Sequence, residues 1–296
     1  AAALWGTLGT VYTLTIAGYG LTPVAVVFYR AVFSALALGG WLLARRHHLL
    51  RLPRAAAPLV LAYGLLGVTV FYVAYIYAVV LVGVTTAVVL LYTAPALVAL
   101  LAWRFLGETM SRAKVAALAL TFAGVVLVAG AYDPAQLGGN LLGLACGILA
   151  AATYALYSIF GKLAHRSRLP SATLLVYTLA IGAAGLLCCY LPGFFLGDMW
   201  PGALAPVTLL SPGPRLEVWA VLITLGTVQT LAPVAAYTAS LQHLDAGVAS
   251  MCATLEPVVA GFLAFAVLRE PLGLPELAGA GLILVAVALL QNGARR

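Results

Sequence analysis

A stretch of 49 residues without a single Asp, Glu, Lys, Arg or His, from Ala55 to Trp103, constrains the fold of this chain most. As one helix with a rise of about 1.5 Å per residue, it would be roughly 74 Å long. The hydrocarbon core of a bilayer is only about 30 Å thick. The stretch therefore has to fold back once, and we expect the turn near Val82-Gly83.

The amino-acid composition excludes a soluble protein. Charged residues make up 8% of the 296 residues and apolar residues 64%, whereas soluble domains carry about 25% charged residues. The same composition excludes intrinsic disorder. Because the apolar stretches are continuous and do not alternate with polar residues, they indicate helices and not a β-barrel. The chain is therefore predicted to be an all-α polytopic membrane protein.

Turn residues and charged clusters divide the chain into ten apolar spans, which predict ten transmembrane helices. An even number of spans puts both termini on one side of the membrane. The longest connection, 193–216, lies on the opposite side and is interrupted by Pro and Gly, so we expect it along the interface. The predicted spans are 3–20, 23–44, 57–80, 83–104, 113–131, 140–160, 171–192, 217–240, 245–268 and 274–292.

Basic residues are distributed unevenly between the two predicted sides. Of the 15 Lys and Arg residues, 12 fall on the side of the termini, Arg215 and Arg269 fall opposite, and Arg30 lies within a span. Because Lys and Arg are enriched in cytoplasmic loops, both termini are expected in the cytoplasm and the chain in the cytoplasmic (inner) membrane. The net charge of +7 therefore reflects topology and does not indicate binding to nucleic acid.

The sequence repeats itself at an offset of 162 residues. Pro95 corresponds to Pro257, and Glu108 corresponds to Glu270, so that the spacing from Pro to Glu is 13 residues in both halves. The repeat divides the chain into two related halves.

Each half, about 1–131 and 140–292, contains five predicted spans. Because five is odd, the second half enters the membrane from the opposite face, and the fold is predicted to be two inverted five-helix repeats. Glu108 is then expected on the cytoplasmic side and Glu270 on the external side. Inverted repeats can exchange conformations, which suits a carrier that works by alternating access. We expect the single chain to function as a monomer.

Six short motifs stand out along the two halves. They are Trp5-Gly6, Tyr29-Arg30, Leu90-Leu91-Tyr92-Thr93-Ala94-Pro95, Leu106-Gly107-Glu108, Ala253-Thr254-Leu255-Glu256-Pro257 and Leu268-Arg269-Glu270. Together they resemble the EamA-type module of the drug/metabolite transporter superfamily, and the resemblance covers nearly the whole chain. It implies a ten-helix carrier with a central cavity between the halves, often an exporter of amino acids or other small metabolites.

Glu256 lies near the middle of the predicted span 245–268. An ionised carboxylate at that depth is costly, so it should be protonated, paired or exposed to water. One interpretation is a site that binds substrate and couples transport to protons. The other is a structural carboxyl hydrogen-bonded to backbone beside a proline, since Pro95 and Pro257 are both expected to kink their helices.

Arg30 lies about seven residues, or roughly 10 Å, below the outer end of its predicted span. Its guanidinium cannot easily neutralise itself by losing a proton. It can bind a substrate carboxylate, pair with an acidic side chain such as Glu256, or extend outward to the interface.

Several further polar side chains fall within the predicted spans. A tyrosine offers an apolar face and a hydroxyl, which suits an amphipathic solute in a cavity. The alternative for each is a packed ring whose hydroxyl bonds a neighbouring carbonyl. The candidates for substrate binding are Tyr75, Tyr92, Tyr154, Gln229 and Tyr237, of which Tyr75 and Tyr237 are related by the repeat.

Catalytic and cofactor motifs are absent from the sequence. It has no GxxxxGK[ST] phosphate loop, no HExxH and no GxSxG on a plausible strand–turn–helix. The four histidines lie at or beyond the span ends, and the four cysteines fit apolar packing positions. We therefore expect neither an enzyme nor a protein that uses a metal or cofactor.

These observations predict a secondary active transporter that moves small organic metabolites across the bilayer by alternating access. Export of amino acids or related solutes and coupling to protons follow only from the resemblance. The alternative is an uncoupled channel or uniporter with the same fold.

Overall fold

The computed structural model describes residues 1–11, 23–134, 140–196, 216–269 and 273–293. Within these ranges the chain consists of helices and short connections and contains no β-strand. The prediction of an all-α fold is therefore confirmed for the described part of the chain.

The described α-helices fall largely within the predicted spans, but several spans are divided between two helices, and α4 covers parts of two spans. They are α1 (Ala2–Val11), α2 (Pro23–Arg45), α3 (Ala57–Gly64), α4 (Phe71–Leu91), α5 (Ala94–Leu101), α6 (Arg112–Val128), α7 (Leu141–Arg166), α8 (Ser171–Leu196), α9 (Leu216–Gly226), α10 (Ala232–Ser240), α11 (Ala246–Ala253), α12 (Glu256–Leu263) and α13 (Leu274–Gly293). Two short 3₁₀ helices follow α2, namely η3 (His47–Leu50) and η4 (Arg54–Ala56).

Some predicted features lie outside the described residues. These are Glu270, Arg215, the last two arginines of the chain and most of the connection 193–216.

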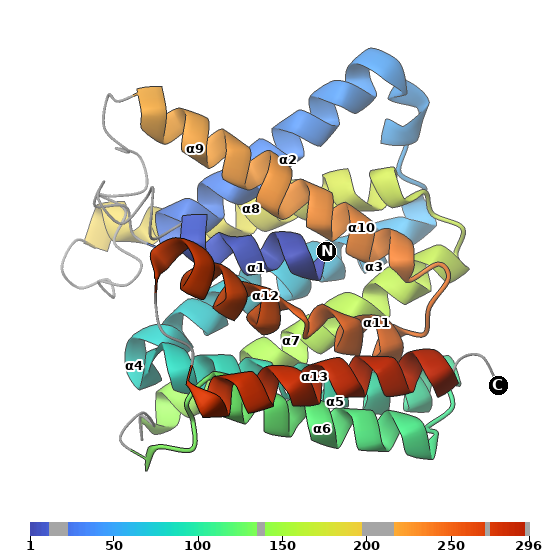
Figure 1. The fold of residues 1–296 in the computed structure, drawn as a ribbon. Coiled ribbons are helices and arrows are strands. Elements are labelled where there is room, and N and C mark those ends of the chain that lie inside the picture. The colour runs from blue at the N-terminus through green and yellow to red at the C-terminus, as the bar shows by residue number, and fades with distance from the viewer. Residues whose placement is uncertain (12–22, 135–139, 197–215, 270–272, 294–296) are drawn as a thin grey trace.

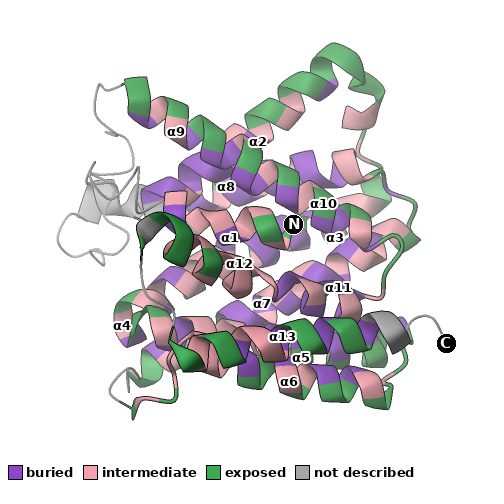
Figure 2. Cartoon of the chain, viewed as in Figure 1, coloured by how far each residue is buried: buried purple, intermediate pink, exposed green. Residues whose placement is uncertain are grey.

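Among the described residues, six helical segments are long and apolar enough to cross a membrane, and two shorter apolar segments accompany them. Large apolar side chains are exposed on the outer helices, for example Leu141, Phe262 and Leu284. Figure 2 shows many buried residues on α7 and α8, while α9 and α13 have extensive exposed surface. An exposed apolar surface of this kind requires a lipid environment, so the chain is a multi-pass membrane protein.

Gly83 interrupts the long uncharged stretch inside α4. Its φ of 81° and ψ of 163° are far from helical values, and glycine adopts a positive φ without the steric cost of a side chain. The predicted break at Val82-Gly83 is therefore confirmed.

The segment that contains this break starts and ends on the same end of the bundle. Thr173 Oγ1 donates to the carbonyl of Leu49 at 2.6 Å, and Arg166 Nη2 donates to the carbonyl of Leu106 at 2.5 Å. Thr173 and Arg166 flank the connection from α7 to α8, so residues 49 and 106 lie near each other. The chain between them has folded back once, as the length of the uncharged stretch requires.

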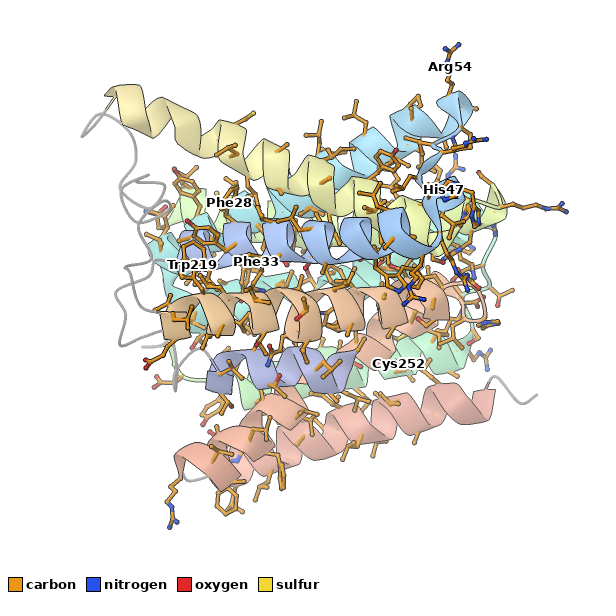
Figure 3. The ribbon with its side chains drawn as sticks, turned by 90° about the horizontal axis from the view of Figure 1, so that it is seen from above. Phe28, Phe33, His47, Arg54, Trp219 and Cys252 are labelled. Carbon is orange, nitrogen blue, oxygen red and sulfur yellow. The ribbon has the colours of Figure 1, made fainter. Side chains whose placement is uncertain are left out.

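We call this end of the bundle the basic end, because most of the described Lys and Arg residues gather there. Figure 3 shows Arg54 and His47 at this end and Phe28 and Trp219 toward the other. The basic end carries Arg45, Arg46, Arg51, Arg54, Arg104, Arg112, Lys114, Lys162, Arg166 and Arg168.

Irregular backbone segments recur at the 162-residue offset of the sequence repeat. Four π-helical segments form two such pairs, with η5 (Leu65–Val70) matching η11 (Thr227–Leu231) and η6 (Ala102–Leu106) matching η12 (Ala264–Leu268). A π-turn places one extra residue in the helix and so rotates the side chains beyond it.

The helix packing follows the same correspondence between the halves. The α2 and α9 helices pack together, as do α8 and α3, while α1 packs against α12 and α7 packs against α4 and α5. The contact of α2 with α9 corresponds to the contact of α8 with α3, and the contact of α1 with α12 corresponds to the contact of α7 with α5. The α6 and α13 helices pair with each other at one side of the bundle (Figure 1).

Candidate functional site

A cavity of about 210 Å³ lies between the two halves of the chain. Its wall is formed by residues of α1, α2, η5, α4, α7, α8, η11, α10 and α12. Most of the wall is apolar and rich in aromatic rings: Trp5, Phe71, Tyr72, Tyr75, Tyr154 and Tyr157. Four polar side chains also face it: Arg30, Thr178, Thr230 and Glu256. This combination suits a small amphipathic solute.

Glu256 is the first residue of α12, directly after a two-residue interruption at Thr254 and Leu255. The predicted continuous span 245–268 is therefore broken in its middle. The start of a helix carries free backbone N–H groups and a partial positive charge, which favour a carboxylate there. The side chain is half-buried, and the Tyr92 hydroxyl lies close to its carboxyl group.

Arg30 is 9% exposed and reaches the cavity from α2. Its Nε donates to Thr230 Oγ1 at 2.8 Å, and Thr230 Oγ1 donates to the Leu225 carbonyl at 2.8 Å. The Leu225 carbonyl lies five residues before Thr230, as the π-turn in η11 requires. This turn therefore orients the hydroxyl that holds Arg30.

Arg30 and Glu256 face the same cavity without a direct ion pair. The positive charge of Arg30 acts on the Glu256 carboxyl, but no N···O contact within ion-pair distance joins these two described residues. Among the described residues, Thr230 is the recorded hydrogen-bond partner of the guanidinium. Its terminal nitrogens are therefore available to an anionic group in the cavity.

A layer of tyrosines lies between this cavity and the basic end. The ring centroids of Tyr154 and Tyr157 lie 6.5 and 6.1 Å from that of Tyr237. The Tyr237 hydroxyl lies 2.8 Å from Ser158 Oγ, within hydrogen-bonding distance. Tyr237 is buried and does not belong to the cavity wall.

The structure brings four of the predicted binding residues to the cavity wall, namely Arg30, Tyr75, Tyr154 and Glu256. The other three are absent from it. Tyr92 contacts the Glu256 carboxyl, while Tyr237 and Gln229 pack beside the wall.

The sequence predicts that Gln229 binds substrate, but its neighbour Thr230 faces the cavity instead. Gln229 is buried, and its Oε1 has no hydrogen-bond partner among the described residues. Both residues lie in the π-turn η11, so the ordinary helical periodicity of the sequence does not give their direction.

Pro95 and Pro257 each occupy the second position of a helix, α5 and α12. Each of these helices begins after a two-residue turn, so the interruption comes before the proline and not after it.

Trp5, Phe71 and Thr178 reach the cavity wall although the sequence did not single them out as binding residues. The sequence repeat is a signal that could have predicted other residues of the cavity wall. At the 162-residue offset, Val68 matches Thr230 and Tyr72 matches Val234, and all four line the cavity. Comparing both halves position by position is therefore a usable signal for the wall.

A second cluster, the Glu108 network, joins the two halves at the basic end. The Glu108 carboxylate is 8% exposed and accepts from the backbone N–H groups of Ala246 at 2.7 Å and Gly247 at 3.4 Å. Lys114 Nζ lies 2.7 Å from Asp245 Oδ2 and 3.9 Å from Glu108 Oε2. Glu108 thus caps the start of α11 from the other half, while Asp245 makes no side-chain cap there.

Metal-ligating side chains do not gather in the part of the chain that the structure describes. It contains no group of three or more His, Cys, Asp or Glu side chains able to hold an ion, and Cys146, Cys188, Cys189 and Cys252 are free thiols.

Comparison with known proteins gives matches over nearly the whole chain. The model of the EamA-like transporter family matches residues 1–130 and 141–291. An uncharacterized transporter of Archaeoglobus fulgidus is 26% identical over 288 residues, which cover 95% of this chain and 97% of the relative. The uncharacterized transporter YvbV of Bacillus subtilis is 28% identical over 260 residues, which cover 83% of this chain and 75% of the relative.

A solved crystal structure shares the fold. It superposes with a TM-score of 0.78 at 21% sequence identity, covering 100% of this chain and 95% of the other. At this identity the likeness concerns the fold alone.

Proposed function

The chain belongs to the EamA-like transporter family of the drug/metabolite transporter superfamily, and from this premise we propose that it is a secondary active transporter of zwitterionic metabolites. The proposed solutes are amino acids or related compounds, exported by alternating access and exchanged for protons at Glu256. Such a protein is a carrier embedded in the bilayer and not an enzyme.

The observation that carries this proposal is the pair of opposite charges in one apolar cavity. Arg30 offers guanidinium nitrogens for a carboxylate, and Glu256 offers an acceptor for an ammonium group. Both are secured by neighbouring hydroxyls, Thr230 and Tyr92. Aromatic rings on the same cavity wall suit an apolar side chain. A zwitterion would satisfy both charges at once, whereas a neutral solute would leave them unpaired.

The proposed architecture is ten transmembrane helices in two inverted repeats, 1–131 and 140–292. Its support is the recurrence of π-turns and helix breaks at the 162-residue offset. The exchange symmetry of the packing pairs is further support.

Alternating access gains support from the basic end. The Glu108 network and the bond from Arg166 to the Leu106 carbonyl both join one half to the other there. Opening the cavity toward this end requires these contacts to break. By the distribution of basic residues, we place this end and both termini in the cytoplasm, with the monomer in the inner membrane.

The proposal is tested by measuring solute flux in proteoliposomes that contain the full chain. Three radiolabelled probes are compared: an aromatic amino acid, the amine that lacks its carboxylate, and the acid that lacks its amino group. We expect the amino acid to be transported fastest, and a pH gradient acidic on the side opposite the solute to accelerate its efflux.

A variant of Glu256 and a matched control variant complete the test. Glu256→Gln should abolish the response to the pH gradient, and Glu217→Gln, at the start of α9, serves as the matched control. Equal flux of all three probes, with no response to the gradient in the unmodified protein, would replace this proposal with an uncoupled channel or uniporter.

A further inference from the structure

A second cavity, of about 440 Å³, opens at the basic end, apart from the central cavity. Its wall is formed by the end of α7, the connection to α8 and the connection from α10 to α11. Four of the described residues that line it are basic: Lys162, His165, Arg166 and Arg168, and none is acidic. The volume lies within the range of about 300–1,000 Å³ that is typical for ligand sites.

Contacts within the protein use part of this positive charge. Lys162 Nζ donates to the carbonyls of Leu241 at 2.9 Å and Leu244 at 2.6 Å, which follow the end of α10. Arg166 Nη2 donates to the carbonyl of Leu106. These partners are neutral carbonyls, and among the described residues no carboxylate forms an ion pair with either side chain.

Arg168 occupies a backbone position after α7 at which glycine is the usual residue. Its φ is 56°, in the left-handed region that glycine favours. Its N–H donates to the His165 carbonyl at 2.9 Å, and the N–H of Leu169 donates to the Ala164 carbonyl at 3.0 Å, which together form a Schellman motif. Glycine is the usual residue at this position because it avoids the steric cost. The chain instead places a third full positive charge on the pocket, in a conformation unfavourable for its residue type.

We propose that this pocket binds the acidic phosphate group of a phosphate-bearing anion, supplied by the headgroup of an anionic phospholipid. The three permanent charges and the absence of a wall carboxylate select a net negative ligand. A phosphate accepts several hydrogen bonds at once, which suits Arg166 and Arg168. The pocket lies at the ends of membrane-spanning helices, where headgroups reside. This site does not depend on the proposed transport function.

The test is a thermal-unfolding titration of the full chain in neutral detergent. The ligands are short-chain phosphatidylglycerol, phosphatidylcholine of the same chain length, and inorganic phosphate. We expect phosphatidylglycerol to raise the melting temperature in a saturable way and phosphatidylcholine to have little effect. Saturable stabilisation by inorganic phosphate to the same extent would also support the site but would identify its source as a soluble anion.

Two variants separate binding from folding. Arg168→Gly removes a charge and supplies the residue that the left-handed position favours, so the protein without ligand should be as stable as before or more stable. Its apparent affinity for phosphatidylglycerol should nevertheless fall roughly fivefold. Arg54→Gln removes an exposed charge from the same end outside the pocket and should leave the affinity unchanged. An equal loss in both variants, or no saturable stabilisation by either anion, would overturn the proposal.

Discussion

Places related by the 162-residue offset share interruptions of the backbone and differ in chemistry. Ala94 opens α5 and Glu256 opens α12, each after a two-residue turn and each followed by a proline. Ala94 is buried in packing, whereas Glu256 faces the cavity. The repeated backbone thus provides the interruption in both halves, and one half alone uses it to present a carboxylate.

Arg30 on α2 is a second position at which the two halves differ in chemistry. A Cβ on Gly226 would lie 3.1 Å from the Arg30 carbonyl oxygen, and one on Gly64 would lie 3.1 Å from that of Thr178. Gly64 and Gly226 are related by the 162-residue offset, so Thr178 on α8 is the structural equivalent of Arg30. Both line the cavity, and one carries a charge. Asymmetric chemistry on a symmetric backbone lets a cavity recognise a solute with two different ends.

A third difference concerns the ends of the halves. Ala246, the first residue of α11, is 0% exposed and is capped by Glu108, whereas its equivalent Val84, after Gly83, is 62% exposed. At the basic end Glu108 covers the start of α11, and among the described residues no side chain covers Val84 in the same way.

The largest predicted effect tests the Arg30–Thr178 comparison. Arg30→Gln should lower kcat/KM for a zwitterionic solute roughly 100-fold, about 3 kcal/mol, because the solute carboxylate loses its charged partner in a desolvated site. Thr178→Val should lower it only about threefold. Both values are measured as initial rates in proteoliposomes. Similar losses in the two variants would mean that the halves recognise the solute alike.

The next effect tests the closure at the basic end. Glu108→Gln weakens a charged cap on two backbone N–H groups and should cost about 2 kcal/mol, shifting the population toward opening at the basic end roughly 30-fold. The readout is the rate at which an impermeant thiol reagent labels a cysteine introduced at Leu241, in a background without native cysteines. Glu217→Gln at the opposite end is the control, and identical labelling of both variants would reject the gating role of Glu108.

A smaller effect is expected where α6 of the first half and α13 of the second half approach each other closely. A Cβ added at Gly124 on α6 would lie 2.7 Å from the Gly279 carbonyl oxygen, and one added at Gly279 on α13 would lie 2.6 Å from that of Gly124. Replacing either by Ala should therefore destabilise the protein by about 1.5 kcal/mol through overpacking. Gly281 has nothing within 4 Å of such a Cβ, so Gly281→Ala should be tolerated. Thermal unfolding in detergent measures all three, and a cost at only one of Gly124 and Gly279 would contradict the reciprocal close approach of α6 and α13.

The smallest effect concerns the left-handed residues that end η6 and η12. Gly107 has a φ of 69° and its equivalent Arg269 a φ of 59°. Gly107→Ala should destabilise the protein by about 1 kcal/mol, and Arg269→Gly should stabilise it by a similar amount, because only glycine adopts this region freely. Both changes are read from melting temperatures. Destabilisation by Arg269→Gly would reveal a contact of this arginine that outweighs its backbone strain.

Features that depend on neighbours along the chain were predictable from the sequence. The uncharged stretch set the need for a turn, and Gly83 supplies it. The repeat was readable because Pro95, Pro257 and Glu108 keep their spacing. Helix bounds followed from hydropathy, since each span has to match the bilayer by itself.

Features that depend on how the helices rotate and cross were decided by the tertiary structure. The π-turn η11 brings Thr230 and not Gln229 to the cavity, because one extra residue rotates the next turn of the helix by roughly 100°. Tyr75 lines the cavity while its equivalent Tyr237 packs behind the wall. The spacing of residues along a helix determines the depth of each side chain in the membrane. Contacts between helices distant in sequence determine which of these side chains share a site.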